Sequence, residues 1–394
     1  MTGATHVRRP CPCCGTPAAE ALFHNRMAPI GGLDMSYRVA RCGRCNFAYA
    51  NELAPASHYD YYYRNFSKYD VIPSTDAVPA VARLRAEAVT SFCERHVRRG
   101  EAVADLGCGA GVLLSTFHRR GWQALHGLDP APGAPAQARQ LFGLDGVHAG
   151  TLSEAGQILP LDQIGLVCLT GVLEHLPELR TDLVELFDRL RPGTRILVEV
   201  PAMERFLEAP SEPYGEFSLE HIQYFSAVTL AQLFTTLGAS PIELEILDLP
   251  AGTTDSLLGL FEVGTGRPAP RLEQHDQDDR ILTDYLRQSQ QTLEKALARL
   301  AACTAHQIVV YGAGSHTARL LPHLVRMGLG SRIVAIMDGN PNLHGQTFGS
   351  WRIEAPETMR SWPDATVVIS SFRAQSSIAE ALAQAFPNHV LQLY

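Results

Sequence analysis

One glycine-rich segment constrains the fold of this chain more than any other feature of its sequence. Residues 102–114 read Ala-Val-Ala-Asp-Leu-Gly-Cys-Gly-Ala-Gly-Val-Leu-Leu. The pattern predicts a buried strand, a turn with three alternating glycines, and a helix. Glycines let a backbone approach a ligand closely, and the start of a helix offers free N–H groups to a carboxylate or another anion. The segment therefore predicts an α/β domain with a ligand site after this strand.

Further apolar runs place this segment in a larger sheet. Four runs have the character of buried parallel strands separated by helical stretches, and they cover 102–106, 124–128, 164–169 and 195–200. An amphipathic helix over 77–98 leads into the domain. After a helix near 228–237, two β-rich segments at 242–249 and 257–263 could pair as an antiparallel edge. We therefore expect a doubly wound, Rossmann-like sheet.

Cysteines are concentrated at the start of the chain. Five of the nine lie in the first 45 residues, and they form the two knuckles Cys11-x-x-Cys14 and Cys42-x-x-Cys45. This spacing is typical of four thiolates that hold one structural zinc ion. Cys13 is a surplus thiol that could compete with Cys14 for the site. The alternative is that all of these cysteines are reduced core residues.

The length of the chain predicts several domains, because 394 residues exceed the roughly 100 to 200 of an ordinary domain. A second α/β pattern starts at Ile308, with strands expected at 308–311, 333–337 and 366–370. The leucine stripe of the preceding helix, from Leu282 to Leu300, is expected to be core. The expected units are a zinc-binding module with a Tyr-rich run at 1–75, the Rossmann-like domain at 76–265, a linker and helix at 266–303, and a second Rossmann-like domain at 304–394.

The charge and composition of the chain limit the classes of molecule that it is expected to bind. The formal net charge is −8, and no run of Lys or Arg interleaved with aromatic residues is present, so we expect a small-molecule substrate and no nucleic acid. No apolar stretch approaches the roughly 20 residues that cross a bilayer. We expect a soluble, cytoplasmic protein without a membrane partner. The oligomeric state stays open, a homo-oligomer included.

The glycine-rich segment has an acidic partner at the end of the next strand. Asp129 lies about 20 residues beyond the loop that Asp105 begins, where a carboxylate can accept hydrogen bonds from both ribose hydroxyls. With the strand end at 169–175, the spacing closely resembles that of class I S-adenosylmethionine-dependent methyltransferases. The resemblance implies donor-binding roles for the following residues: Asp105, Gly107, Gly109, Gly111, Asp129, Thr151 and Thr170. The alternative is an ordinary tight turn between strand and helix.

Two Glu-His pairs offer proton-transfer groups. Glu220-His221 follows the strand at 195–200, and Glu174-His175 lies at the end of the strand at 164–169. Imidazole has a pKa well matched to general-base catalysis near neutral pH. His221 is the first candidate for the base and His175 the second. The alternative is that one member of each pair only satisfies backbone groups.

The C-terminal domain carries a second glycine turn. It reads Gly312-x-Gly314-x-x-Thr317, with Asp338 at the end of the next strand. One interpretation is that the turn binds a nicotinamide dinucleotide, but the third glycine of that fingerprint is absent. The other interpretations are that the turn faces the pyrophosphate of a sugar nucleotide, or that it is purely structural.

Taken in order, these features resemble the sugar C-methyltransferases, over essentially the full length of the chain. The order is zinc knuckles, Tyr-rich run, methyltransferase core, the Glu220-His221 segment and the C-terminal glycine turn. The resemblance implies three domains, a structural zinc, and methylation of C3 of a TDP-4-keto-deoxysugar through an enolate. It implies active-site roles for His175, Glu220 and His221, and substrate contacts from Tyr62, Tyr63 and Tyr224.

Two departures lie on the acceptor side. Ser218-Leu219 stands where the family usually has Tyr-His, and residues 250–256 replace a His-Gly-Gly-Ser-like stretch. An O- or N-methyltransferase of a secondary metabolite or glycan, which needs positioning and one base, is therefore the alternative function. A third reading is a scaffold protein whose zinc module and last domain bind a partner.

Overall fold

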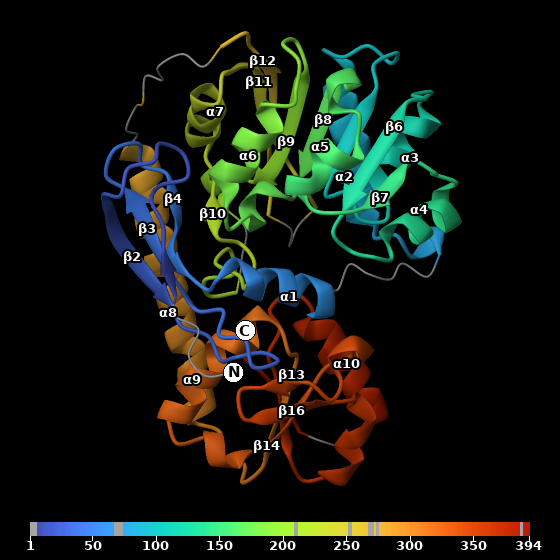
Figure 1. Ribbon diagram of the computed structural model, residues 1–394. Coiled ribbons are helices and arrows are strands. Elements are labelled where there is room, and N and C mark those ends of the chain that lie inside the picture. The colour runs from blue at the N-terminus through green and yellow to red at the C-terminus, as the bar shows by residue number, and fades with distance from the viewer. Residues whose placement is uncertain are drawn as a thin grey trace.

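The computed structural model describes residues 6–66, 74–208, 212–250, 254–266, 272, 276–386 and 389–394 (Figure 1). Three β-sheets organise these residues. Residues 267–271 and 273–275 of the predicted linker and helix at 266–303, and residues 251–253 of the departing segment, lie outside the described residues. Among the described residues, no helix combines the length and the apolar character that a bilayer-crossing segment needs.

The central sheet has seven strands in the order β11-β12-β9-β8-β5-β6-β7. Its strands are β5 (Val103–Leu106), β6 (Leu125–Asp129), β7 (Val147–Ala149), β8 (Leu166–Thr170), β9 (Arg195–Pro201), β11 (Ala239–Leu247) and β12 (Ser256–Val263). The strands from β7 to β9 run parallel, and β12 and β11 close the sheet as an antiparallel edge. The expected doubly wound α/β fold is confirmed. The short β7 is the strand that the apolar runs did not reveal.

Helices cover this sheet on both faces (Figure 1). They are α2 (Ala80–Glu94), α3 (Val112–Arg119), α4 (Ala134–Phe142), α5 (Ala155–Ile158), α6 (Leu179–Phe187) and α7 (Ala227–Thr236). One apolar cluster includes Phe92, Phe117 and Trp122, while another includes Phe187 and Phe234. The parallel strands are therefore buried on both sides, which explains their uninterrupted apolar sequences.

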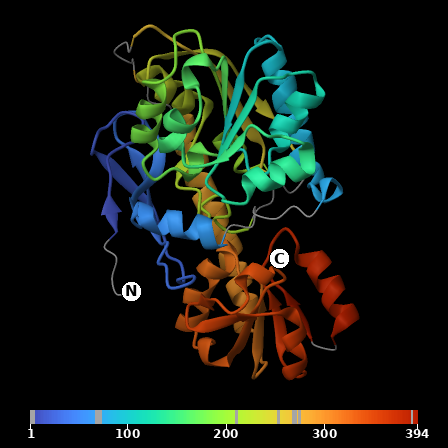
Figure 2. The same cartoon turned by 45° about the vertical axis from the view of Figure 1, so that its right-hand side comes forward.

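The N-terminal sheet is small and antiparallel. It contains β1 (Val7–Arg8), β2 (Ala19–Asn25), β3 (Tyr37–Cys42) and β4 (Ala48–Leu53), in the order β1-β4-β3-β2. A strand from far along the chain, β10 (Gln223–Tyr224), also pairs with β4. The Tyr-rich run forms helix α1 (Ala56–Phe66), which lies between the central sheet and the C-terminal domain (Figures 1 and 2).

The C-terminal sheet has six strands in the order β15-β16-β14-β13-β17-β18. The elements are β13 (Ile308–Tyr311), α9 (Ser315–Arg326), β14 (Ile333–Met337), β15 (Thr347–Phe348), β16 (Trp351–Glu354), β17 (Thr366–Ile369), α10 (Gln375–Ala385) and β18 (Val390–Gln392). The three expected strands are present, and β15, β16 and β18 were not foreseen.

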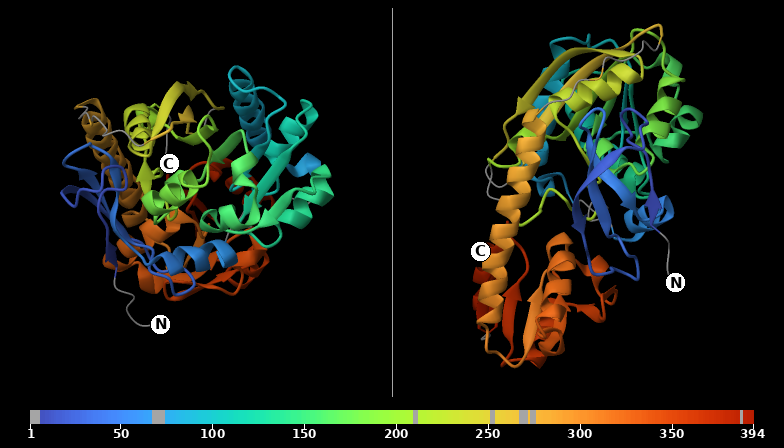
Figure 3. Two further views of the ribbon diagram at one scale, coloured as in Figure 1. Left: turned by 45° about the horizontal axis from the view of Figure 1, so that its top comes forward. Right: turned by 90° about the vertical axis from the view of Figure 1, so that its left-hand side faces the viewer.

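Helix α8 (Asp276–Ala301) runs beside both the central and the C-terminal parts (Figure 3). Leu282, Leu293 and Leu300 are buried along it, in a cluster that also contains side chains of the N-terminal sheet and of the C-terminal domain. The leucine stripe is therefore core, as expected, and it lies in an apolar core that several parts of the chain share.

Candidate active site

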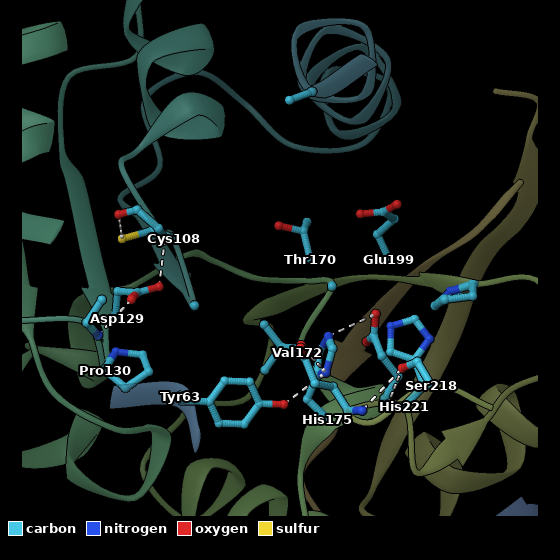
Figure 4. A pocket seen from close by; sticks show the side chains of 18 of the residues that line it. Tyr63, Cys108, Asp129, Pro130, Thr170, Val172, His175, Glu199, Ser218 and His221 are labelled. Carbon is cyan, nitrogen blue, oxygen red and sulfur yellow. Dashed lines mark hydrogen bonds and ion pairs between the residues drawn. The ribbon is translucent and has the colours of Figure 1, made fainter. Parts of the chain in front are cut away.

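A cavity of about 1590 Å³ lies where the C-terminal ends of the central strands, helix α1 and the C-terminal domain meet. Figure 4 shows the part of it that is lined by the central strands and Tyr63. In open α/β sheets, ligands bind outside the carboxyl ends of the strands. A volume above the roughly 300 to 1,000 Å³ of a drug-sized pocket leaves room for two ligands together. The cavity is therefore the candidate site for a donor and an acceptor.

The glycine-rich loop forms one wall of this cavity. Gly107 and Gly109 line it, whereas Gly111 precedes α3 behind the wall. Gly107 has φ +89°, and a Cβ there would lie 2.5 Å from Cγ2 of Val172. An L side chain would be strained in that backbone region and would also collide. This explains the glycine at the start of the turn.

Asp129 is held at the rim of this wall by backbone N–H groups. Its Oδ2 accepts a hydrogen bond from Gly109 N at 2.7 Å, and its Oδ1 accepts one from Ala131 N at 2.9 Å. Burial raises the pKa of this carboxyl, while the two backbone hydrogen bonds oppose the rise. Each oxygen keeps a second lone pair, so the carboxylate can still accept two ribose hydroxyls. Thr151 and Thr170 line the same cavity.

Asp105 contributes a buried oxygen without a partner. The residue is 1% exposed, and its Oδ1 has no hydrogen-bond partner among the described residues. Burial, together with the charge of Asp129, raises the pKa of Asp105 to about 7. A buried polar atom without a partner is costly unless a ligand satisfies it. An orphaned carboxylate oxygen beside a glycine loop fits the amino group of S-adenosylmethionine.

Three of the predicted proton-transfer residues meet on the opposite wall. Nδ1 of His175 lies 3.1 Å from the hydroxyl of Tyr63 and 3.9 Å from Oε2 of Glu220. The ring of His221 stands edge-on to that of His175, with centroids 4.9 Å apart (Figure 4). All four side chains line the cavity. Tyr63, more than 100 residues earlier in the sequence, thus joins the two Glu-His segments in one polar cluster.

The other two predicted substrate contacts lie behind this cluster. Tyr62 does not line the cavity; its hydroxyl donates a 3.0 Å hydrogen bond to Oε1 of Glu220. The prediction for Tyr224 is wrong, because this side chain is buried in the core away from the cavity. Its hydroxyl donates to the carbonyl oxygen of His221 at 2.8 Å and lies 3.1 Å from the Tyr37 hydroxyl. The two-residue strand β10 turns Tyr224 inward.

Ser218 shapes the loop that carries the second Glu-His pair. Its Oγ accepts hydrogen bonds from the backbone N–H groups of Glu220, at 3.2 Å, and His221, at 3.0 Å. Leu219 is buried. The departing Ser-Leu pair therefore serves the local backbone and the core.

Glu199 and Arg85 are cavity residues that the sequence did not single out. Glu199 lies near the end of β9, is 1% exposed, forms an ion pair with Arg85 of α2, and accepts a hydrogen bond from Ser256. The signal was present in the sequence, since Glu199 interrupts an apolar run. A buried charge in a strand is retained only when it is paired.

The four predicted zinc ligands lie together. Sγ of Cys11 is 3.6 Å from Sγ of Cys45, Sγ of Cys14 is 3.5 Å from Sγ of Cys42, and all four sulfurs lie within 4.8 Å of one another. Tetrahedral zinc with bonds of about 2.3 Å sets its sulfurs nearly this far apart. Cys13 is outside the group, and its carbonyl oxygen accepts a 2.7 Å hydrogen bond from Arg180. The sulfur arrangement is compatible with zinc.

The C-terminal glycine turn faces the same cavity. The backbone N–H of Ala313 donates to Oδ2 of Asp338 at 2.7 Å, which repeats the bond between Gly109 and Asp129. Gly312, Gly314 and Asp338 line the cavity, whereas Thr317 is buried and donates to Ser370 Oγ at 2.7 Å.

Comparison with known proteins agrees with this donor wall. Residues 80–244 match the family model described as a methyltransferase domain. This part of the chain is similar to a methyltransferase domain. The match leaves the cysteine cluster and the C-terminal sheet outside it.

Curated relatives match a smaller part of the chain. A mitochondrial ubiquinone biosynthesis O-methyltransferase from Schizosaccharomyces pombe is 31% identical over 112 residues, which is 27% of this chain and 40% of the relative. A tRNA U34 carboxymethyltransferase from Shewanella loihica is 31% identical over 128 residues, 30% of this chain and 38% of the relative. The chain thus spans about two fifths of the length of these relatives.

Solved structures of similar shape include the 1,6-didemethyltoxoflavin-N1-methyltransferase of Burkholderia thailandensis with S-adenosylhomocysteine. It is 19% identical with a TM-score of 0.41, and the match covers 55% of this chain and 96% of that one. The glycopeptide N-methyltransferase MtfA with sinefungin is 18% identical with a TM-score of 0.36, over 45% of this chain and 93% of that one.

Proposed function

We propose that this protein transfers the methyl group of S-adenosylmethionine to the carbon beside the ketone of a nucleotide-linked keto-deoxysugar. The observation that carries the proposal is the shared cavity, since one space is lined by the donor loop, the cluster around His175 and the C-terminal glycine turn. Its volume suits a donor and a sugar nucleotide together.

The donor side is assigned to four residues. When bound, S-adenosylmethionine supplies an electrophilic methyl group on a sulfonium. Asp129 accepts hydrogen bonds from the ribose hydroxyls. The unpartnered oxygen of Asp105 accepts a hydrogen bond from the amino group of the donor. Gly107 and Gly109 keep the loop close to the ligand because they lack side chains.

The acceptor side needs a base and a group that stabilises an enolate. His221, His175 and Glu220 are the candidates for removing the proton beside the ketone. The hydroxyl of Tyr63, held 3.1 Å from His175, lies on the same wall and can donate a hydrogen bond to the developing oxyanion. Tyr62 keeps Glu220 in place from behind.

The nucleotide end of the acceptor is assigned to the C-terminal domain. The backbone of its glycine turn can approach a pyrophosphate, and Asp338 repeats the position of Asp129 relative to its own turn. With the donor held by the central domain, the sugar would lie between the two glycine turns.

The alternative is O- or N-methylation of a secondary metabolite or glycan. Ser218 and Leu219 favour it, because both serve the loop and leave no second phenol or imidazole at that point. Transfer to oxygen or nitrogen requires positioning and at most one base.

Isotope exchange separates the two readings. The protein is incubated with a TDP-4-keto-6-deoxysugar in deuterated water, with and without S-adenosylmethionine, and mass spectrometry follows C3 exchange and methyl gain. Exchange without the donor and methyl gain with it are expected for the enolate route. If the donor binds tightly but neither exchange nor methyl gain is seen, the result favours the alternative, methylation of oxygen or nitrogen in another acceptor.

A further inference from the structure

A second group of metal-ligating side chains lies inside the cavity. Glu174, His175 and His221 each offer one ligand atom, and these three atoms lie within 4.8 Å of one another. A cation with bonds of roughly 2.1 Å holds neighbouring ligand atoms roughly 3 to 4 Å apart. The group is separate from the cysteine cluster, which contains only sulfur ligands.

Glu174 is the member whose environment points most directly to a cation. The residue is 3% exposed, and its Oε2 has no hydrogen-bond partner among the described residues. Its other oxygen, Oε1, lies 3.8 Å from Nε2 of His175. A buried carboxylate is costly unless it is paired or coordinates a metal. The oxygen without a hydrogen-bond partner can therefore serve as a cation ligand.

His175 is oriented as a metal-binding imidazole usually is. Its Nδ1 faces the hydroxyl of Tyr63 at 3.1 Å, which leaves Nε2 directed toward Glu174. Ligating histidines commonly use one ring nitrogen for an outer hydrogen bond and the other for the metal. Tyr63 then supplies the outer contact.

The backbone around the third ligand is fixed from several sides. The carbonyl oxygen of His221 accepts hydrogen bonds from the buried hydroxyls of Tyr37, at 3.1 Å, and Tyr224, at 2.8 Å. The next residue, Ile222, donates its N–H to the carbonyl oxygen of Glu174 at 2.8 Å. The two segments that carry the ligands are thus tied directly to each other. A site for a cation needs this kind of support.

The local charges also favour a cation. Glu174 belongs to the group, and a second acidic residue, Glu220, lies next to it. Oε2 of Glu220 is 3.9 Å from Nδ1 of His175. The nearby guanidinium of Arg85 is engaged by Glu199. The side chains around the site are therefore two carboxylates and two imidazoles, and the carboxylates attract a cation.

We propose that Glu174, His175 and His221 bind a divalent transition-metal cation, with its remaining positions open to the cavity. Two imidazoles and one carboxylate suit Mn²⁺, Fe²⁺, Co²⁺ or Zn²⁺ better than Ca²⁺. The open positions would take an oxygen of the acceptor; this role rests on the proposed methyl transfer, whereas cation binding does not. A cation there makes the two imidazoles ligands, and of the three candidates for the base it leaves Glu220.

Manganese titration tests the site in the full chain after one equivalent of zinc has been added for the four clustered cysteines and free zinc has been removed. Mn²⁺ is the probe because it competes weakly for thiolates, and its free concentration is followed by electron paramagnetic resonance. Wild type is expected to bind one Mn²⁺ per chain. Glu174→Gln and His221→Asn should each weaken binding at least tenfold, while His118→Asn, at an exposed site on α3, should bind like wild type.

Circular dichroism and S-adenosylmethionine binding are measured on the same samples. Native spectra and donor affinity in His221→Asn show that its loss of Mn²⁺ is local, even if Glu174→Gln unfolds. Absence of Mn²⁺ binding by wild type, or equal binding by folded His221→Asn, overturns the proposed site. Donor binding in either case leaves the proposed methyltransferase function standing, so the two failures are distinguishable.

Discussion

At the scale of single residues, the two aspartates of the donor wall have different roles. Asp129 has both oxygens tied to backbone N–H groups, so it is pre-oriented before a ligand arrives. Asp105 is buried with one oxygen unsatisfied. In the proposed donor site, affinity would depend on one carboxylate that is already in place and on another that gains its partner only on binding.

Replacing Asp129 by Asn should weaken donor binding. The amide turns one acceptor oxygen into a donor, which then faces a backbone N–H or a ribose hydroxyl. We expect an affinity loss of at least roughly tenfold, or about 1.4 kcal/mol, by isothermal titration calorimetry. Asp145→Asn is the control, because that side chain is 80% exposed. Equal affinity in Asp129→Asn would rule out the ribose role.

His316 predicts how stability depends on pH. Burial lowers its pKa from 6.5 to about 4, while its Nδ1 lies 2.7 Å from Ser370 Oγ. Between pH 6.5 and pH 4 the unfolded chain binds a proton that the folded chain does not, so stability falls as the pH falls. This contribution reaches at most about 3 kcal/mol near pH 4.

Chemical denaturation at several pH values measures the contribution. His316→Gln should lose less stability than wild type between pH 6.5 and pH 4, and the exposed control His306→Gln should follow wild type. Parallel curves for wild type and His316→Gln would show that other groups cause the acid sensitivity.

At the scale of elements, helix α1 connects the N-terminal module to the cavity. It presents Tyr63 to His175 while Tyr62 holds Glu220. Two neighbouring residues on one helix therefore orient residues from two different segments of the methyltransferase domain.

Tyr63→Phe should slow methyl transfer and leave donor affinity unchanged. The substitution keeps the ring and removes the hydroxyl that faces His175, so the imidazole loses an orienting contact. Loss of one positioned polar group typically costs roughly 10²-fold or more in kcat. Tyr61→Phe on the same helix, 46% exposed, is the matched control. Unchanged steady-state rates in Tyr63→Phe would remove Tyr63 from the active site.

The cysteine knuckles make a further element-scale prediction. They pack against the methyltransferase domain, where Arg180 and Thr236 contact the carbonyl oxygen of Cys13. Cys42→Ser should abolish stoichiometric zinc and lower the Tm, because a structural zinc contributes directly to folding. Cys303→Ser, outside the cluster, should retain the metal. Metal analysis that finds no zinc in wild type would contradict the assignment.

The sequence predicted the donor wall better than the acceptor wall, for a physical reason. Gly107, Gly109 and Asp129 belong to adjacent strand ends, so local spacing already determines their proximity. Tyr63, His175 and His221 meet only because three distant segments pack together. Tyr224 was misplaced because a two-residue strand leaves no periodic signal, and its pairing with β4 turns the side chain into the core.

At the scale of the whole molecule, one buried arginine joins all three parts. Arg319 of α9 donates to the carbonyl oxygens of Pro213, at 2.8 Å, and Phe217, at 2.6 Å. It also donates to Oδ1 of Asn25 at 3.2 Å. The C-terminal domain, the segment before Glu220 and the N-terminal sheet therefore share one hydrogen-bonded node.

Arg319→Met should weaken the coupling between the parts. Removing the guanidinium leaves two buried carbonyl oxygens with fewer donors, at a cost of roughly 3 to 5 kcal/mol. Calorimetry should show a lower Tm and separation of one cooperative transition into two. Arg326→Met, exposed on the same helix, is the control. A single unshifted transition in Arg319→Met would show that the apolar core alone holds the parts together.

The pairing of β10 with β4 limits how such a chain can be recombined. His221 stands two residues before a strand whose ladder belongs to the N-terminal sheet, and Ala50 N also donates to the carbonyl oxygen of Ile222 at 2.8 Å. The unit that could be transplanted between homologues with its acceptor preference intact is therefore not a continuous domain. It includes two separate stretches, roughly 37–63 and 212–226, that must travel together.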